Sequence, residues 1–296
     1  MANLKEIRTR IGSVRSTMQV TGAMKMVSAA KLKKAQNDVA KVRPFEQKLS
    51  QLMGFLGSSV AGAEQNYPAY RVSDKGKILI VAIASDKGLA GAFNANIVKE
   101  VERLLSNDFA ADRAQGNVEV LAVGKQVSKG LRTRHVDVPY TEQEGFYDSL
   151  TAQTVYEVAD GIRSRFEGKE YRRVVVLYNM FVNAAVQNVS MVQLLPLQVT
   201  PPEEGDKTFF RDFIIEPSKE EVLADLIPQA IRTRLLSVVR ESLASEHGAR
   251  MTSMHKATDN AGELLGELQL QYNKARQSAI TNELIEIVSG ASALNG

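Results

Sequence analysis

The sequence contains no cysteine and no tryptophan, and aromatic residues make up only 6% of its 296 residues. Without cysteine there is no disulfide, no thiolate zinc site and no cysteine nucleophile, so a reducing compartment fits best. The longest apolar run is ILIVAIA at 78–84, far below the roughly 20 residues that a membrane-spanning helix needs. The first residues, MANLKEIRTR, are charged and lead into no apolar segment, which predicts no secretory signal. We therefore expect a globular protein without direct membrane insertion.

Positive charge is concentrated in residues 1–50. This segment holds eleven Lys and Arg against three acidic residues, a net charge of +8, whereas the whole chain carries +3. A basic helix predicts an acidic partner, which could be nucleic acid, anionic lipid or an acidic protein surface, although a solvated helix face explains the charge equally well. The scarcity of aromatic residues argues against nucleic acid bound by stacking, and the small residues in the middle of the segment argue against a membrane-surface helix.

Residues 4–42 follow the heptad repeat that is typical of a coiled coil. Nine of its twelve seam positions are apolar, and the three polar ones, Thr21, Lys25 and Ser28, follow one another along the seam. Pro44 should distort the helix, which is then predicted to continue to about residue 57. Small polar residues are unusual on a seam that must hold a second helix, and a close approach of the two helices explains them.

Between about residues 75 and 200 the hydrophobic pattern is that of buried strands alternating with helices. This alternation predicts βαβ units and a mostly parallel, Rossmann-like sheet that helices cover. The segment 61–77 before it is predicted to be a linker, and the Pro-rich TPPEEGDK at 200–207 ends the domain. The expected strands are 77–86, 118–124, 172–181 and 184–197, and the expected helices are 95–105 and one capped by Thr151 that runs to Phe166.

A second long helix is predicted to begin at a capping box formed by Ser218 and Glu221. Pro228 should interrupt it early, and no strong helix breaker follows before Gly290. A helix of this length needs a partner for its apolar stripe, and the N-terminal helix is the only other long one predicted. We therefore expect an α/β fold plus a long antiparallel coiled coil. Its parts are an N-terminal helix at 1–58, a Rossmann-like domain at 75–200 and a C-terminal helix at 218–296.

No motif predicts a catalytic site, a metal site or a cofactor site. The turn Gly88-x-x-Gly91 after the first strand lacks the spacing of a phosphate-binding loop, so a tight strand-to-helix turn is the better interpretation. His247 and His255 are eight residues apart, too far along one helix to share a metal ion. Two other classes of protein stay open at this point: a small-molecule-binding α/β enzyme dimerised by its coiled coil, and a coiled-coil scaffold for nucleic acid.

Three stretches of the chain resemble the γ subunit of F-type ATP synthases. The similarity extends from about residue 4 to 294, and the absence of a cysteine-bearing insert makes it resemble the bacterial type, without a thiol switch. The stretches are LKEIRTRIGSVRSTMQVTGAMKMVSAAKLKKAQ at 4–36, SDKGLAGAFNANI at 85–97 and ESLASEHGARMTSMHKATDNAGELLGELQLQYNKARQSAITNELIEIVSGASAL at 241–294.

This resemblance implies a central-stalk rotor that couples proton flow through the membrane c ring to conformational changes of the catalytic β subunits. It implies, as partners, three α and three β subunits around one γ subunit, together with the ε subunit and the c-subunit ring. The nucleotide chemistry would belong to the α and β subunits, so no active site, cofactor or metal is expected in this chain. The expected location is the cytoplasmic face of the bacterial inner membrane, as a peripheral part of the ATP synthase.

Carried over to the matching positions, the resemblance also implies contacts with the β subunit. Arg276 and Gln277 are expected to donate hydrogen bonds to β-subunit loops when the rotor pauses. The small residues between Thr21 and Ala30 would give a thin surface that passes three nonequivalent partners without locking to one of them. The implied contact residues are Met24, Lys25, Arg250, Arg276, Gln277 and Thr281.

Overall fold

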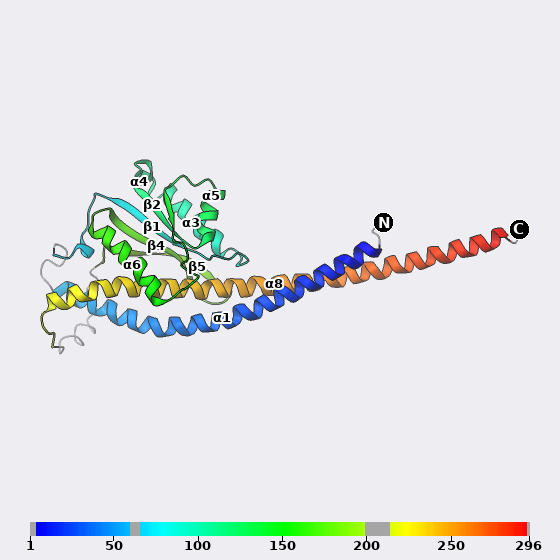
Figure 1. The fold of residues 1–296 in the computed structure, drawn as a ribbon, viewed down its shortest axis with the longest axis horizontal. Coiled ribbons are helices and arrows are strands. Elements are labelled where there is room, and N and C mark those ends of the chain that lie inside the picture. Colours follow the sequence, from blue (N-terminus) through cyan, green and yellow to red (C-terminus); the bar gives the residue numbers. More distant parts are fainter. Residues whose placement is uncertain (1–3, 60–65, 199–213, 295–296) are drawn as a thin grey trace. The chain divides into compact units, whose positions relative to one another are not determined.

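The computed structural model describes residues 4–59, 66–198 and 214–294 (Figure 1). The chain divides into two compact units, Met1–Ser28 with Met251–Gly296, and Ala29–Arg250. The elements are α1 (Leu4–Ser59), η1 (Pro68–Tyr70), β1 (Lys77–Ile83), α3 (Phe93–Ser106), α4 (Ala110–Ala114), β2 (Val118–Val123), α5 (Lys125–Thr133), β3 (Tyr140–Glu142), α6 (Ala152–Glu167), β4 (Tyr171–Phe181), β5 (Gln187–Leu195) and α8 (Lys219–Leu294).

The larger unit, Ala29–Arg250, contains a five-stranded sheet in the order β3-β2-β1-β4-β5. The strand β1 pairs in parallel with β2 and with β4, and β2 pairs in parallel with β3. Only β5, at one edge, is antiparallel, to β4. The predicted mostly parallel sheet is therefore confirmed, and its order reverses between β1 and β4, as it does where the two halves of a Rossmann fold meet.

Each face of this sheet has its own hydrophobic core. Successive side chains of a strand point to opposite faces, so β1 supplies both cores. On one face, Leu79 and Val81 pack with η1, α6 and the parts of α1 and α8 that belong to this unit. On the other face, Ile78 and Ile80 pack with α3 and α5. The nearly continuous apolar sequence of β1 follows from this burial on both sides.

In the larger unit, the C-terminal part of α1 lies antiparallel to the N-terminal part of α8. Asp38 forms an ion pair with Arg240 at 3.3 Å, and Glu46 forms one with Arg234. The residue numbers rise along α1 while they fall along α8, which gives the direction. Leu32 and Ala35, on the predicted seam, and Leu49 beyond it are buried.

The smaller unit also pairs the two helices in antiparallel fashion. Thr258 Oγ1 donates to Thr21 Oγ1 at 2.9 Å, and Lys25 Nζ donates to His255 Nδ1 at 3.1 Å. All twelve predicted seam positions of α1 are buried or half-buried. The predicted antiparallel coiled coil is therefore confirmed within each unit.

The structure differs from the prediction at α8, which continues through Pro228 as one helix. Leu223, Ile227 and Ile231 are buried on both sides of the proline, and their packing holds the helix although one backbone hydrogen bond is lost. The capping interaction itself is present, since Ser218 Oγ accepts from Glu221 N at 3.2 Å. Similarly, α1 contains Pro44 and ends at Ser59.

Three short elements, α4, α5 and β3, were not predicted, because each has too few residues to show a periodic pattern of apolar side chains. The segment predicted as a linker contains η1, in which Ala69 and Tyr70 are buried. Its residues 61–65 and the Pro-rich segment 200–207 lie outside the described residues. The division into parts at 1–58, 75–200 and 218–296 stays a prediction, because the two compact units divide both terminal helices differently. Within the described residues, no helix has a stretch that is both long enough and apolar enough to cross a membrane.

Candidate functional site

Five of the six implied contact residues lie in the smaller unit, at two levels along its helices. Met24 and Lys25 are half-buried on α1, and Lys25 contacts His255 of α8. Since His255 precedes Arg276 by 21 residues, the two levels are about 32 Å apart along α8. The structure therefore does not gather these residues into one site. The three residues of the second level are exposed: Arg276, Gln277 and Thr281.

The level of Lys25 contains a polar layer between α1 and α8. His255 Nδ1 accepts from Lys25 Nζ at 3.1 Å and lies 3.3 Å from Asp259 Oδ2. One turn away, the hydroxyls of Thr21 and Thr258 are joined at 2.9 Å. Two of the three polar positions of the predicted seam, Thr21 and Lys25, thus meet polar partners on the other helix. In the sequence, the only sign of this layer was that His255 and Asp259 are four residues apart and so lie on one face of a helix. This spacing could be interpreted only once the structure showed that His255 lies opposite Lys25.

Exposed apolar side chains accompany both levels. Val20, Met26 and Val27 of α1 are 56–69% exposed. A group of apolar residues near the end of α8 is similarly exposed, although a helix normally buries its apolar side chains against a partner. Contiguous exposed apolar surface is typical of a protein–protein interface. The residues of the α8 group are Ile280, Leu284, Ile285, Ile287 and Val288.

The sixth residue, Arg250, is buried in the larger unit. Its Nη1 donates to Glu246 Oε1 at 2.6 Å, one turn earlier on α8. Its Nη2 reaches the carbonyl oxygens of Lys87 and Gly88 at 3.2 and 3.4 Å, and its Nε reaches that of Gly88 at 3.4 Å. Burial raises the pKa of Glu246, and the neighbouring guanidinium acts against this shift. Arg250 therefore binds the turn after β1, a contact that no sequence spacing could have indicated.

This turn lies at the carboxyl end of the central strand β1, where Rossmann-like sheets usually bind their ligands. In this chain α8 approaches the same region closely, because a Cβ atom on Gly248 would lie only 3.3 Å from Ala184 Cα, just after β4. The backbone of the turn is tight, with positive φ angles of 61° at Leu89 and 58° at Gly91. The predicted tight turn is confirmed, and the guanidinium of Arg250 donates hydrogen bonds to the carbonyl oxygens of Lys87 and Gly88 in this turn.

Further polar groups surround the turn on other sides. Tyr147 donates its hydroxyl to Ala84 O at 2.7 Å, and Asp86 Oδ1 accepts from the first backbone N–H of α5 at 3.0 Å. His247, next to Glu246, is also buried, and its burial, together with the positive charges of Arg250 and Lys31, lowers its pKa to about 4. In the described part of the chain, no three acidic or histidine side chains form a group suited to a metal ion.

Comparison with known proteins identifies the family. The model of the ATP synthase family matches residues 3–294. The chain is 48% identical to the ATP synthase gamma chain of Flavobacterium johnsoniae and 47% identical to that of Christiangramia forsetii, in each case over the full length of both chains. The chain belongs to the ATP synthase γ-chain family. The resemblance inferred from the three sequence stretches is thereby confirmed.

Solved structures agree with membership of the γ-chain family. The central stalk of the Tetrahymena thermophila mitochondrial ATP synthase matches with a TM-score of 0.55 at 26% identity, over 80% of this chain and 99% of that one. The rotor of the Euglena gracilis mitochondrial ATP synthase matches with a TM-score of 0.64 over 94% and 98% of the two chains. The second match, at 19% identity, supports the fold alone. As a member of the γ-chain family, the chain is a subunit of an ATP synthase.

Proposed function

We propose that this chain is the central rotary shaft of an F-type ATP synthase. It couples proton flow through the c ring to successive conformational changes of the catalytic β subunits, and in reverse it couples ATP hydrolysis to proton pumping. One observation carries the proposal: a chain 48% identical over its full length to an ATP synthase gamma chain exposes apolar side chains on both helices of its smaller unit. Such a surface needs a surrounding partner.

The proposed partners are three α and three β subunits around this chain, with the ε subunit and the c ring. The chain itself carries no active site, because nucleotide binding and hydrolysis belong to the α and β subunits. The position between β1 and β4, which a Rossmann-like enzyme would use for a ligand, is covered by α8 and bound by Arg250, which disfavours the enzyme alternative. The proposed location is peripheral, at the cytoplasmic face of the bacterial inner membrane.

The proposed contacts with the β subunit occupy the two levels of the smaller unit. At the first, Met24 offers a flexible apolar side chain beside the ammonium group of Lys25. At the second, Arg276 and Gln277 expose donors suited to carboxylate and carbonyl oxygens, and Thr281 follows one turn after Gln277. A contact of Arg250 with the β subunit would require this side chain to release at least one of its internal acceptors.

Reconstitution tests the proposal. The purified chain is mixed with isolated α and β subunits, and assembly and ATP hydrolysis are measured. We expect a stable complex with one copy of this chain for every three αβ pairs, and cooperative ATP hydrolysis. If no complex forms and the chain alone binds a nucleotide or another metabolite, the shaft proposal fails and the α/β enzyme is the better interpretation.

A further inference from the structure

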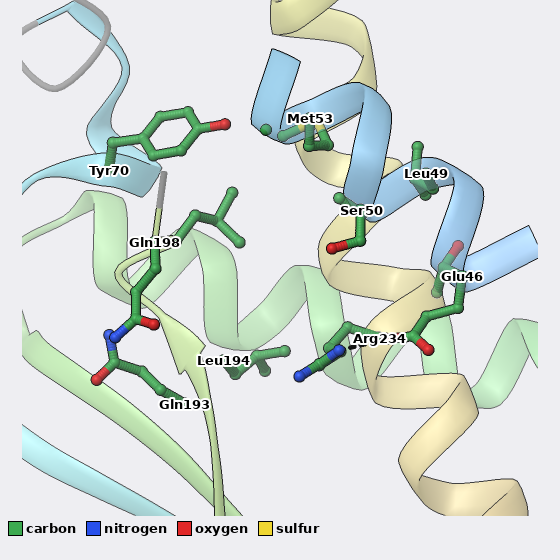
Figure 2. Close-up of a pocket in the computed structure, with 13 residues that line it drawn as sticks. Glu46, Leu49, Ser50, Met53, Tyr70, Gln193, Leu194, Gln198 and Arg234 are labelled. Atoms are coloured by element: carbon green, nitrogen blue, oxygen red, sulfur yellow. Dashed lines mark hydrogen bonds and ion pairs between the residues drawn. The ribbon is translucent and has the colours of Figure 1, made fainter. Parts of the chain in front are cut away.

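A cavity of about 160 Å³ lies in the larger unit, where four elements meet (Figure 2). The C-terminal part of α1, η1, the end of β5 with the residues that follow it, and the N-terminal part of α8 form its walls. One part of the lining is apolar and consists of Leu49, Met53, Leu194 and Leu197. Benzene fills an engineered apolar cavity of about 150 Å³ in another protein, so this volume suits a molecule the size of one six-membered ring.

Two residues of the lining are buried overall but carry hydroxyl groups that have no hydrogen-bond partner among the described residues. Tyr70 is 2% exposed and Thr233 is 6% exposed. Figure 2 shows the Tyr70 hydroxyl turned toward the space between η1 and α1. By contrast, Tyr67 places its hydroxyl on Glu220 O at 2.8 Å, outside the cavity lining. Neither hydroxyl oxygen is among the fully buried side-chain atoms that lack a partner, so each is open to the cavity and can donate to its occupant. An occupant that accepts hydrogen bonds would therefore satisfy both groups.

The charges of the lining balance. Arg234 forms an ion pair with Glu46, and both line the cavity. Burial raises the pKa of Tyr70 to about 12, so its phenol keeps its proton and remains a donor. The side-chain amide of Gln193 already donates to Pro196 O at 2.9 Å. The polar groups left to a ligand, on Ser50, Tyr70, Gln198 and Thr233, are thus neutral and lie beside an apolar wall, which favours an uncharged molecule over an anion or a cation.

We propose that this cavity binds a small uncharged molecule, about the size of a six-membered ring, that accepts hydrogen bonds through a carbonyl or hydroxyl oxygen. Its oxygen would meet the hydroxyls of Tyr70 and Thr233, and its ring would lie against Leu49, Met53 and Leu194. Water alone satisfies the hydroxyls but not the apolar wall. Such a ligand touches α1, η1, β5 and α8 at once, so it stabilises this unit by mass action.

The first experiment uses cyclohexanone as the probe and the full chain labelled with ¹³C at its methionine methyl groups. The Met53 signal, assigned with Met53→Leu, should shift in a saturable way as cyclohexanone is added. Met18 and Met254, in the smaller unit, serve as internal controls that should not shift. Methylcyclohexane, which has the ring but no acceptor, should bind more weakly. A Met53 signal that does not respond, or equal binding of both probes, would overturn the proposal.

Matched variants locate the hydrogen bonds. Tyr70→Phe and Thr233→Val should each weaken cyclohexanone binding by about two- to tenfold, the usual effect of losing one neutral hydrogen bond. Tyr67→Phe makes the same change three residues from Tyr70 and should leave the dissociation constant unaltered. Ala230→Leu should abolish binding, because the larger side chain fills the cavity. Circular dichroism should show that this variant still folds. Unchanged affinity in both Tyr70→Phe and Thr233→Val would contradict the assignment.

Discussion

The guanidinium of Arg250 lies 2.6 Å from the carboxylate of Glu246, and both side chains are about 90% buried. The pair connects α8 to the turn after β1, since the same guanidinium also reaches Lys87 O and Gly88 O. Burying two charges is costly, and their attraction offsets the cost only while both partners and their hydrogen bonds are present. The junction between α8 and the sheet in the larger unit therefore depends on both residues together.

Arg250→Ala should lower the free energy of unfolding of the isolated chain by about 3–5 kcal/mol, because it leaves Glu246 buried without its partner. Urea unfolding followed by circular dichroism measures the change. The double variant Glu246→Leu with Arg250→Met should recover a large part of the loss, since no uncompensated charge is left. If Arg250 served only as a contact for another subunit, the single variant would leave the isolated chain as stable as before.

His247 should make the chain less stable as the pH falls from about 6.5 toward 4. Its pKa is about 4 in the folded chain, against about 6.5 when unfolded, so the unfolded state binds more protons in this window. The loss should approach about 3 kcal/mol, reduced by Glu246, whose raised pKa acts in the opposite direction. Unfolding free energies at pH 7 and pH 5 measure it. His247→Gln should show a smaller difference between the two, and an equal difference would exclude His247 as the cause.

Gly124→Ala should be strongly destabilising. Gly124 has a φ of 99°, and a Cβ atom there would lie 2.4 Å from Ala84 O, at the end of β1. We expect a loss of at least about 2 kcal/mol, since strain and a clash with backbone act together. Gly88→Ala is the matched control, because a Cβ atom at Gly88 meets nothing within 4 Å, and it should change stability by less than about 1 kcal/mol. Thermal unfolding of the two variants measures this difference, and equal losses of stability would contradict the prediction.

Met24→Lys should uncouple ATP hydrolysis from proton pumping in the reconstituted complex. It puts a second cation beside Lys25, whose ammonium group already lies 3.1 Å from His255 Nδ1. Since Met24 is only half-buried, the stability of the isolated chain should change by less than about 1 kcal/mol. The measurement is the number of protons pumped per ATP hydrolysed, which should fall severalfold. Ser106→Lys adds the same charge at an exposed position of the larger unit that is not among the proposed contacts, and it serves as control. Unchanged pumping in Met24→Lys would refute the contact.

Arg276→Ala should impair the assembled complex but not the chain. Arg276 is exposed, so the free energy of unfolding should change by no more than about 0.5 kcal/mol. A charge-assisted hydrogen bond contributes about 1.5–3 kcal/mol, and its loss in the reconstituted complex should slow ATP hydrolysis roughly tenfold or more. Lys274→Ala, at another exposed position of α8, is the matched control. Equal rates for both variants would remove Arg276 from the contact.

Much of the fold could be predicted from the sequence because long elements repeat their pattern many times. The twelve seam positions of α1 and the alternation of strands with helices each rest on many residues. The short strand β3 could not be found this way, because three residues do not define a period. The predicted interruption of the helix at Pro228 was wrong because it considered only local preference. Proline does disfavour helix, but the burial of Leu223 and Ile231 on either side outweighs that preference.

The site was less predictable than the fold. Met24 and Lys25 were selected by their match to a family, and the sequence could not indicate that Lys25 meets His255. Arg250 shows the limit most clearly, because the carbonyl oxygens that it binds belong to residues 87 and 88, more than 160 positions away. Contacts with backbone atoms leave no trace in the identity of the residues contacted.

The division of both terminal helices between two units has a consequence for synthesis on the ribosome. The smaller unit joins Met1–Ser28 to Met251–Gly296, so 222 residues are made between its two halves. At about 5–20 residues per second, the first half waits roughly 10–45 s for the segment that buries its seam. During that time the larger unit can complete its sheet, whereas Ile7 and the other seam residues of the first half stay exposed to water until the last segment of α8 has been made.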